Sequence, residues 1–322
     1  MEKFQSLFET YLTKELPLLH PQGLYHPLHY LMKQGGKRLR PVLLLMATTL
    51  YDENIEQGLP AALAIELFHN FTLAHDDIMD AADLRRGQAT VYKKYGLSSG
   101  ILTGDIALIY AYSYLLKGLK PPLALEVLKI FNETAVDVCR GQQLDMEFEQ
   151  RNHINMDEYL QMIRWKTAVL PAAALQIGAL IGGAKKEDAQ ILYAFGIQLG
   201  LAFQLQDDWL DTFGEDFQTG KRVGGDILQK KKTALVIAAL DAADEKQARQ
   251  LLQWLHAENL DEQTKIAKVQ EAFIQLGAKE AVEEMQQDHT QKALDLLQQL
   301  PLHASRKQML RELAIRLIKR NY

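Results

Sequence analysis

The sequence predicts an all-α fold, arranged as a single domain over residues 1–322. Three observations predict it. Apolar residues recur at helical spacing along most of the chain, strand-like alternation between turn signals is nearly absent, and the breaks between periodic segments are short. No long linker, low-complexity tract or internal repeat interrupts the chain. With 48% hydrophobic residues, the chain can bury a large core in a bundle of about a dozen helices.

The helices are expected in the following order. The first twenty residues form an amphipathic helix of mixed charge, without the basic and then apolar pattern of a signal peptide. Further helical segments are expected at 24–50, 60–82, 100–118, 123–150, 156–181, 187–213 and 234–300. Gly35-Gly36 breaks the first of these segments, and the last is rich in Ala, Leu, Gln and Glu, which favour helix.

The composition argues against several classes of protein. The formal net charge of -5 does not suggest a nucleic-acid binder, which usually carries a strongly basic domain. Apolar stretches are broken by charge before they reach the ~20 residues of a membrane span. The lone cysteine, Cys139, excludes a disulfide framework within the chain and is expected to be a small buried residue. We therefore expect a soluble, cytoplasmic protein with no nucleic-acid partner and no transmembrane segment.

The first aspartate motif, Asp76-Asp77-Ile78-Met79-Asp80, ends an apolar helix. Asp76 and Asp80 share one helical face, about 6 Å apart along the axis, and Asp77 flanks them. Two such carboxylates repel each other by ~3 kcal/mol at an effective dielectric constant near ~20. The helix macrodipole adds to this cost at a C-terminus, and a divalent cation would relieve it.

The second aspartate motif, Asp207-Asp208-Trp209-Leu210-Asp211, has the same spacing and also ends an apolar helix. One such motif is more often a solvated helix end, but two copies near a core favour function, because an unpaired buried charge is expensive. If the two helices face each other, their oxygen ligands suit Mg²⁺, which keeps water and bridges to phosphates. No His or Cys spacing indicates zinc.

Basic residues at three places suit phosphate. They are Lys37 and Arg40 after Gly35-Gly36, Arg85-Arg86, and a third group of Lys166-Thr167, Lys221 and Lys230-Lys231-Lys232. Arginine offers forked donors to phosphate, and lysine offers a point charge. Neither glycine-rich stretch matches a P-loop. Each basic group alone is more often a solvated patch, but together with the aspartates they indicate a site for diphosphates.

These motifs resemble, in order over roughly residues 30–235, the trans-isoprenyl diphosphate synthase (polyprenyl synthetase) family, short-chain type. The resemblance rests on GGKRLRP, ELFHNFTLAHDDIMD, ADLRRG, GQQLD, WKTAVL, FQLQDDWLD and GKRVGGDILQKKKT. It implies the isoprenoid synthase helical bundle with a central active-site cavity, and usually a homodimer. The implied activity is the Mg²⁺-dependent head-to-tail condensation of isopentenyl diphosphate with an allylic diphosphate such as dimethylallyl, geranyl or farnesyl diphosphate.

The resemblance also implies residue roles. Asp76, Asp80, Asp207 and Asp211 would bind Mg²⁺, with three ions per site and Mn²⁺ as a substitute. Asp77, Asp208 and Lys166 would complete the catalytic group. Isopentenyl diphosphate would be held by Lys37, Arg40, His69 and Arg86. The allylic diphosphate would be held by Arg85, Lys166, Thr167, Gln204, Lys221 and Lys231. His69 lies seven residues before Asp76, about 20° from it around an ideal helix.

The implied chemistry needs no protein nucleophile. The allylic C–O bond ionises, the double bond of isopentenyl diphosphate attacks the carbocation, and a proton is lost, in the expected mechanism to the departed diphosphate. Apolar walls must exclude water from the cation. The chain departs from the family pattern at Ala82, where an acidic residue is usual, and at Lys230, where glycine is usual. The second departure leaves the assignment among Lys230, Lys231 and Lys232 open.

Product length is expected to depend on Phe71, Thr72 and Phe68. In the family, the fifth residue before the first aspartate forms the tunnel floor, and a bulky ring there is typical of C15 and C20 enzymes. Ideal helix geometry rotates Phe71 by about 140° from Asp76, so this role rests on the resemblance and not on spacing. Geranylgeranyl diphosphate (C20) is the favoured product, with farnesyl diphosphate (C15) next.

Two alternative classes of protein differ from this sequence in their motifs. A class I terpene cyclase usually replaces the second aspartate motif with an Asn/Ser/Glu-type triad and lacks a second diphosphate site. A regulatory subunit of a heteromeric prenyl synthase typically loses one aspartate motif. Both motifs are intact in this sequence, which argues against each alternative.

Overall fold

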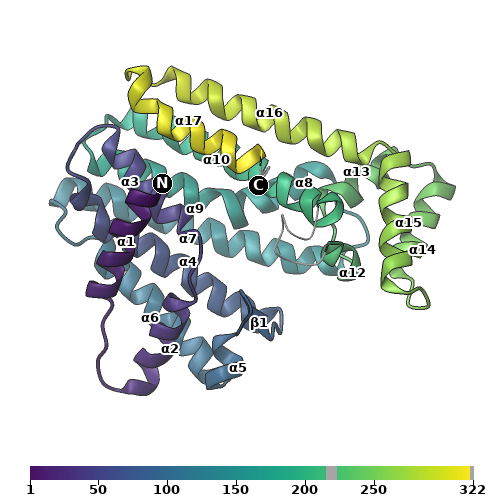
Figure 1. Ribbon diagram of the computed structural model, residues 1–322, viewed down its shortest axis with the longest axis horizontal. Coiled ribbons are helices and arrows are strands. Elements are labelled where there is room, and N and C mark those ends of the chain that lie inside the picture. Colours follow the sequence, from purple (N-terminus) through teal and green to yellow (C-terminus); the bar gives the residue numbers. More distant parts are fainter. Residues whose placement is uncertain (215–222, 320–322) are drawn as a thin grey trace. The chain divides into compact units, whose positions relative to one another are not determined.

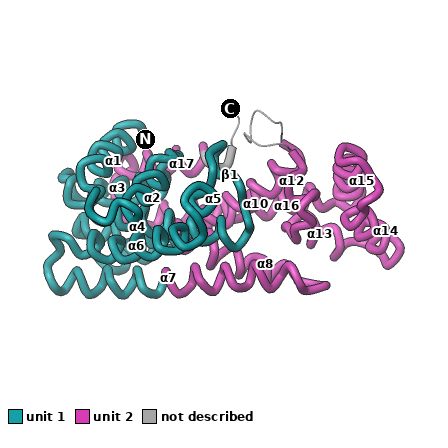
Figure 2. The backbone as a smooth tube through the Cα atoms, turned by 90° about the horizontal axis from the view of Figure 1, so that it is seen from below, with its two compact units in different colours: residues 1–133, 170–193 teal, residues 134–169, 194–322 magenta. Residues whose placement is uncertain are grey.

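The structure, a computed structural model, describes residues 1–214 and 223–319 and confirms the all-α prediction. Over these residues, strand structure is limited to a small hairpin, in which β1 (Leu84–Arg85) pairs antiparallel with β2 (Gln88–Ala89) (Figure 1). The chain divides into two compact units, residues 1–133 with 170–193 and residues 134–169 with 194–322 (Figure 2). The chain passes from one unit to the other within α7, near the start of α9 and within α10, and the single domain over residues 1–322 stays a prediction.

The first unit contains the N-terminal helices. They are α1 (Glu2–Glu15), α2 (Gln22–Lys33), α3 (Leu39–Thr49), the 3-10 turn η1 (Ile55–Gly58), α4 (Leu59–Met79), α5 (Val91–Tyr95), α6 (Leu97–Leu115) and the first part of α7 (Pro121–Gln150). The break that Gly35-Gly36 predicts lies between α2 and α3. Helix α4 is apolar and is buried throughout its first half, so it forms the centre of this unit's core.

Helices α4 and α6 lie unusually close together near the first aspartate motif. A Cβ added at Gly104 of α6 would lie 2.3 Å from Nε2 of His75 on α4, well inside van der Waals contact. His75 also contacts the carbonyl oxygen of Ile101 through Nε2, at 3.1 Å. The glycine is therefore required for this helix pair, and the pair fixes the end of α4 from which the aspartates project.

The second unit contains the rest of α7 and the C-terminal helices. They are α8 (Met156–Ile163), the π-helical segment η2 (Arg164–Ala168), the start of α9 (Val169–Ile181), most of α10 (Lys186–Phe213), α12 (Gly225–Leu228), α13 (Ala234–Ala242), α14 (Glu245–His256), α15 (Glu262–Gln275), α16 (Ala278–Gln299) and α17 (Ala304–Lys319). The predicted helical segment 234–300 is thus four helices. Asp244 and Asp261 cap two of them, because their side chains accept hydrogen bonds from the first-turn amides.

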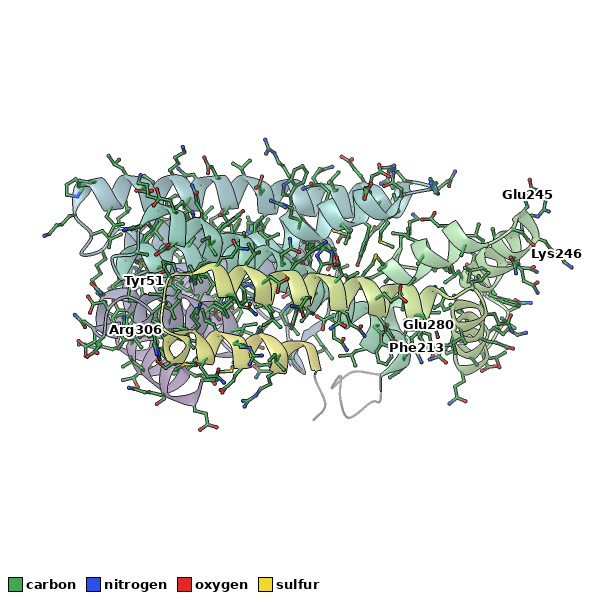
Figure 3. The ribbon with its side chains drawn as sticks, turned by 90° about the horizontal axis from the view of Figure 1, so that it is seen from above. Tyr51, Phe213, Glu245, Lys246, Glu280 and Arg306 are labelled. Carbon is green, nitrogen blue, oxygen red and sulfur yellow. The ribbon has the colours of Figure 1, made fainter. Side chains whose placement is uncertain are left out.

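The end of α10 meets the start of α16 within this unit. Figure 3 labels Phe213, the last residue of α10, and Glu280, in the first turn of α16. Nζ of Lys279 lies 5.2 Å from the Phe213 ring centroid and 5.7 Å from that of Trp209. This cation–π contact fixes the outer side of the helix end that carries the second aspartate motif.

One sequence expectation was wrong. Cys139 is exposed on α7 and is not buried. It lies on a face of this helix where Val136 is also exposed, so the local pattern is an apolar surface rather than a core. None of the described helices combines the length and the hydropathy of a membrane span.

Candidate active site

The first aspartate motif separates into a buried residue and two outer ones. Asp77 is 1% exposed, and its Oδ1 accepts a hydrogen bond from Nε of Arg85 at 2.7 Å. Burial raises the pKa of Asp77, and the charge of Arg85 opposes this rise. Asp76 is half-buried and Asp80 is exposed at the C-terminus of α4. Asp76 and Asp80 are therefore the more exposed carboxylates of the motif, while Asp77 orients Arg85.

Three of the four residues predicted to hold isopentenyl diphosphate come together in the first unit. Nη1 of Arg40 lies 3.1 Å from Nε2 of His69. Arg86 donates a hydrogen bond to the carbonyl oxygen of Gly35. A Cβ at Gly36 would lie 2.8 Å from Nη1 of Arg86, so this backbone approach needs a glycine. The fourth residue, Lys37, is exposed on the same loop.

The electrostatics of this cluster suit an anion. Burial lowers the pKa of His69 well below its ordinary value, and the charges of Arg40 and Arg86 lower it further. His69 is therefore neutral, and its Nε2 accepts a hydrogen bond from Nη1 of Arg40. Burial also lowers the pKa of Arg40, and its buried Nε has no hydrogen-bond partner. A diphosphate would supply both the negative charge and the acceptor that this cluster needs.

Arg38 is a structural residue of this loop that the sequence analysis missed. It is buried at the N-cap of α3 with a φ of 46°, in the left-handed region. Its guanidinium donates to Glu66 Oε1 at 2.6 Å, to Glu9 Oε1 at 2.7 Å and to the carbonyl oxygen of Met32 at 2.6 Å. By joining α1, α2 and α4, it fixes the loop that carries Lys37 and the start of α3 that carries Arg40. The sequence gives no signal that separates it from these two cations.

The second aspartate motif separates in the same way. Asp208 is 3% exposed, whereas Asp207 and Asp211 are half-buried. Oδ2 of Asp211 accepts the backbone N–H of Asp226 at 2.8 Å, which joins the end of α10 to α12. Burial raises the pKa of Asp208 to about 7, although hydrogen bonds from Tyr159, Ala234 and Gln204 lower it.

Four of the residues predicted to hold the allylic diphosphate, Lys166, Thr167, Gln204 and Lys231, lie in the second unit, whereas Arg85 lies in the first unit beside Asp77. Nζ of Lys166 lies 2.5 Å from Oδ2 of Asp145, the last residue of GQQLD. Oγ1 of Thr167 donates to Oε1 of Gln204 at 3.4 Å. Lys166 and Thr167 both lie on η2, a π-helical turn of the kind often found at functional sites. Asp145 was missed as an individual residue, although it belongs to a motif of the resemblance.

The three lysines at 230–232 each contact a different part of the protein. Lys232 donates to the carbonyl oxygens of Phe148 and Glu149 at the end of α7. Nζ of Lys230 lies 3.6 Å from Glu258, and Nζ of Lys231 lies 3.6 Å from Asp226. The contact of Lys232 with α7 gives it a structural role. Lys221, the other late lysine of the prediction, lies outside the described residues.

The predicted chain-length residues form an aromatic row on α4. The Phe71 ring centroid lies 5.5 Å from that of Phe68 and 4.9 Å from that of His75. Phe68 is buried and also contacts Phe131 at 5.2 Å, whereas Phe71 is half-buried. Oγ1 of Thr72 donates to the carbonyl oxygen of His69, so its polar atom is satisfied within the helix. Phe71 is therefore the accessible ring of the row.

The carboxylate oxygens of the two aspartate motifs decide which metal ion would fit there. Among the residues that the structure describes, no group of three or more His, Cys, Asp or Glu side chains could hold a metal ion by itself. Each motif instead offers two outer carboxylates, Asp76 with Asp80 and Asp207 with Asp211. Such sparse, all-oxygen donor sets suit Mg²⁺, which retains water and takes its other ligands from substrate phosphates.

An all-α fold with paired aspartate motifs at helix ends, each beside its own basic cluster, defines a class of diphosphate-handling proteins. The polyprenyl synthetase family model matches residues 21–273. The chain therefore belongs to the polyprenyl synthetase family.

Its relatives carry related names. A geranylgeranyl diphosphate synthase of Methanosarcina mazei is 44% identical and matches over 70% of each chain. A short chain isoprenyl diphosphate synthase of Methanocaldococcus jannaschii is 42% identical over 83% of this chain and 80% of its own. A geranylfarnesyl diphosphate synthase of Natronomonas pharaonis is 38% identical over 71% of this chain and 72% of its own. A solved geranylgeranyl pyrophosphate synthase structure, 41% identical, matches with a TM-score of 0.94 over 100% of this chain and 99% of that one.

Proposed function

We propose that the protein is a Mg²⁺-dependent prenyltransferase that joins isopentenyl diphosphate head-to-tail to an allylic diphosphate, with geranylgeranyl diphosphate as its main product. The observation that carries the proposal is that each of two aspartate motifs has its own basic cluster. Arg40, His69 and Arg86 accompany the first motif, and Lys166 lies in the same unit as the second. Two clusters of this kind match a reaction between two diphosphates.

In this proposal, each basic cluster binds one substrate. The diphosphate of isopentenyl diphosphate is held by Lys37, Arg40, His69 and Arg86, which come from one loop, from α3 and α4, and from the hairpin of the first unit. Lys166, Thr167, Gln204 and Lys231, with Arg85 and Lys221, hold the allylic diphosphate. His69 is neutral, so it orients Arg40 and adds no positive charge of its own.

Mg²⁺ would be held by Asp76, Asp80, Asp207 and Asp211, with three ions per site and Mn²⁺ able to replace them. When bound, the metal supplies charge neutralisation for the leaving diphosphate. Lys166, Lys231 and Arg85 add positive charge at the same oxygens, where charge develops as the bond breaks.

The reaction balances without a protein nucleophile. The C1–O bond of the allylic diphosphate breaks, and its electrons leave with the diphosphate. The double bond of isopentenyl diphosphate forms the new C–C bond to the allylic C1, and a proton is lost from C2 to the departed diphosphate. The half-buried ring of Phe71 and its apolar neighbours on α4 exclude water from the cation.

The length of the product is proposed from the row of rings on α4. Phe71 would close the tunnel that receives the growing chain, with Phe68 and Thr72 beside it. The names of the Methanosarcina mazei relative and of the solved neighbour support a C20 product. Farnesyl diphosphate remains the second candidate, because a bulky ring at this position also suits a C15 product.

A homodimer is proposed from a stripe of exposed apolar side chains on α7. Leu125, Val136 and Met146 are all exposed, at spacings that keep them on one helical face, and Cys139 lies on the same side. A two-fold dimer would cover this face with its own copy. The exposed free thiol of Cys139 favours a reducing compartment such as the cytoplasm.

The test is a direct assay. Purified protein is incubated with labelled isopentenyl diphosphate, Mg²⁺ and each of dimethylallyl, geranyl and farnesyl diphosphate, and the dephosphorylated products are separated by chain length. We expect elongation with all three primers and a C20 end product. The absence of an elongated product from every primer would refute the proposal, and a C15 end product would correct its length.

A further inference from the structure

The side chain of Asp208 accepts three hydrogen bonds from other parts of the protein. The hydroxyl of Tyr159 and the backbone N–H of Ala234, at 3.1 Å, both donate to Oδ2. Nε2 of Gln204 donates to Oδ1 at 3.1 Å. Both oxygens of this buried carboxylate therefore have protein partners, from α8, α10 and α13.

The bond from Ala234 fixes the start of α13. Ala234 is the first residue of this helix, and its N–H is one of those that a helix leaves without an intrahelical acceptor. Thr233 occupies the N-cap but makes no side-chain capping bond, so Asp208 supplies this cap from another helix. The start of α13 is thereby tied to the second aspartate motif.

The same tie fixes the lysine run that leads into α13. Just before Ala234, Lys232 is anchored to the carbonyl oxygens at the end of α7. The segment is thus held at both of these points, and Lys231 lies between Lys232 and a backbone turn at Lys230, whose φ is 57°. The Lys231 side chain remains 57% exposed beside Asp226. Its backbone N–H also donates to the carbonyl oxygen of Asp226 at 2.9 Å, so its position is set by this bond together with its anchored neighbours.

Asp208 also sets the orientation of Gln204. Because Nε2 of Gln204 donates to the carboxylate, Oε1 faces Thr167 and accepts its hydroxyl. A reversed amide would place Oε1 against the carboxylate and Nε2 against Thr167. Asp208 therefore determines which groups of Gln204 and Thr167 remain for a ligand.

We infer that Asp208 is a positioning residue and not a metal ligand: it holds Gln204, Thr167 and the start of α13, and so presents Lys231 and Thr167 to the allylic diphosphate. The inference rests on the proposed function for the identity of this ligand. The position of the segment 230–237 does not depend on that identity, and it can be measured in the protein without substrate.

The test compares Asp208→Asn with Asp207→Asn. Asparagine keeps the shape of the side chain, but its NH₂ group cannot accept a hydrogen bond as the second carboxylate oxygen does. One of the three present donors therefore loses its acceptor on this side chain. We expect Asp208→Asn to raise the KM for the allylic substrate by about tenfold or more, with little change in the KM for isopentenyl diphosphate or in the Mg²⁺ concentration for half-maximal rate. Asp207→Asn should raise that Mg²⁺ concentration.

Hydrogen–deuterium exchange supplies a readout that needs no activity. Backbone amides of 230–237 should exchange faster in Asp208→Asn than in the wild type. Tyr159→Phe, which keeps the carboxylate and two of its donors, should produce the same change to a smaller extent. Asp261→Asn is the matched control, because Asp261 caps α15 in a similar way and asparagine caps equally well, so neither readout should change.

Two outcomes would overturn the inference. One is unchanged exchange at 230–237 in Asp208→Asn, and the other is an increase in the Mg²⁺ requirement as large as that of Asp207→Asn. If the wild type elongates no primer, the proposed function fails, but the exchange experiment still decides whether Asp208 holds the start of α13.

Discussion

At the scale of single residues, the charge state of His69 follows from its neighbours. A histidine with its ordinary pKa would be partly protonated just below neutral pH. In this protein, burial and the adjacent arginines keep it neutral, so its Nε2 can accept from Arg40. The resemblance to the family predicted His69 as a site residue, but its role as a neutral acceptor depends on Arg40 and Arg86, which come from other elements.

This charge state predicts a pH dependence of stability. The folded-state pKa of His69 lies below its unfolded value, so the unfolded chain binds an extra proton as the pH falls below about 6.5. The free energy of unfolding should then decrease more steeply in the wild type than in His69→Gln, by a slope approaching about 1.4 kcal/mol per pH unit. Urea denaturation between pH 5 and pH 8 measures both slopes. Parallel curves would contradict the prediction.

Phe71 carries a prediction about product length. Phe71→Ala removes the accessible ring of the aromatic row and leaves the buried Phe68 in place, so the product should lengthen by at least one C5 unit. Mass spectrometry of the dephosphorylated products measures the change. Leu73→Ala, at another half-buried position of α4, is the control and should leave the length unchanged. An unchanged product of Phe71→Ala would exclude this ring as the tunnel floor.

At the scale of secondary-structure elements, close helix contacts set the position of the basic residues. A Cβ at Gly141 of α7 would lie 2.2 Å from the backbone nitrogen of Lys166. The motif GQQLD therefore has two separate uses. Gly141 lets α7 approach η2, and Asp145, one turn further on, pairs with the Lys166 side chain.

Gly141→Ala should therefore reduce activity. The new methyl group meets backbone, which cannot rotate away, so η2 must shift and carry Lys166 with it. We expect a loss of stability of about 1–3 kcal/mol and at least about a tenfold loss of kcat/KM. Thermal unfolding and steady-state kinetics measure the two effects. Gly23→Ala, where the Cβ would meet nothing within 4 Å, should change neither.

Arg38 joins three elements and carries a prediction of its own. Its side chain and that of Glu66 are 2% and 4% exposed, so Arg38→Ala leaves a buried carboxylate without its main partner. The free energy of unfolding should fall by about 3–5 kcal/mol, as urea denaturation can measure. Glu9→Ala breaks the outer bond of the same network, where the carboxylate is 41% exposed, and should cost less than about 1 kcal/mol. Equal losses for both variants would contradict this reading.

At the scale of the whole molecule, most of the fold followed from local pattern. The apolar periodicity of residues 60–82 and 187–213 predicted α4 and α10 within a few residues, because long, strongly periodic segments determine their own structure. The i, i+4 spacing predicted that the outer aspartates of each motif share a helical face, and each of these residues lies at the helix end where it was expected. The buried roles of Asp77 and Asp208 did not, because they depend on Arg85 and Tyr159, which reach them from other elements.

The prediction was least accurate for apolar residues that the structure places on the surface. Cys139 was expected to be buried because most free cysteines are, but its neighbours on α7 include the exposed Val136. A helix whose apolar face is covered by a second chain has the same sequence pattern as one that faces its own core. Composition and periodicity therefore cannot tell an interface from an interior.

The proposed homodimer predicts a change of assembly state. Replacing Leu125 and Val136 together by Glu places charges on the exposed apolar face of α7, so a dimer should dissociate into monomers. Light scattering coupled to size-exclusion chromatography measures the mass in solution. Leu252→Glu, at an exposed apolar position of α14, is the control and should leave the dimer intact. A monomeric wild type would contradict the proposal.

The π-helical turn η2 has a consequence for how this chain can vary. Such a turn holds one more residue than a turn of the regular helix on either side of it. The segments α8, η2 and α9 therefore form one continuous helix with a single inserted residue. Deleting one residue there would restore a regular helix without breaking it, because the wider turn holds the extra residue within about one turn. A single-codon deletion in this stretch would therefore preserve the helical content and the face that carries Tyr159, while it moves Lys166 and Thr167 out of the wider turn, a lesion that circular dichroism would not detect.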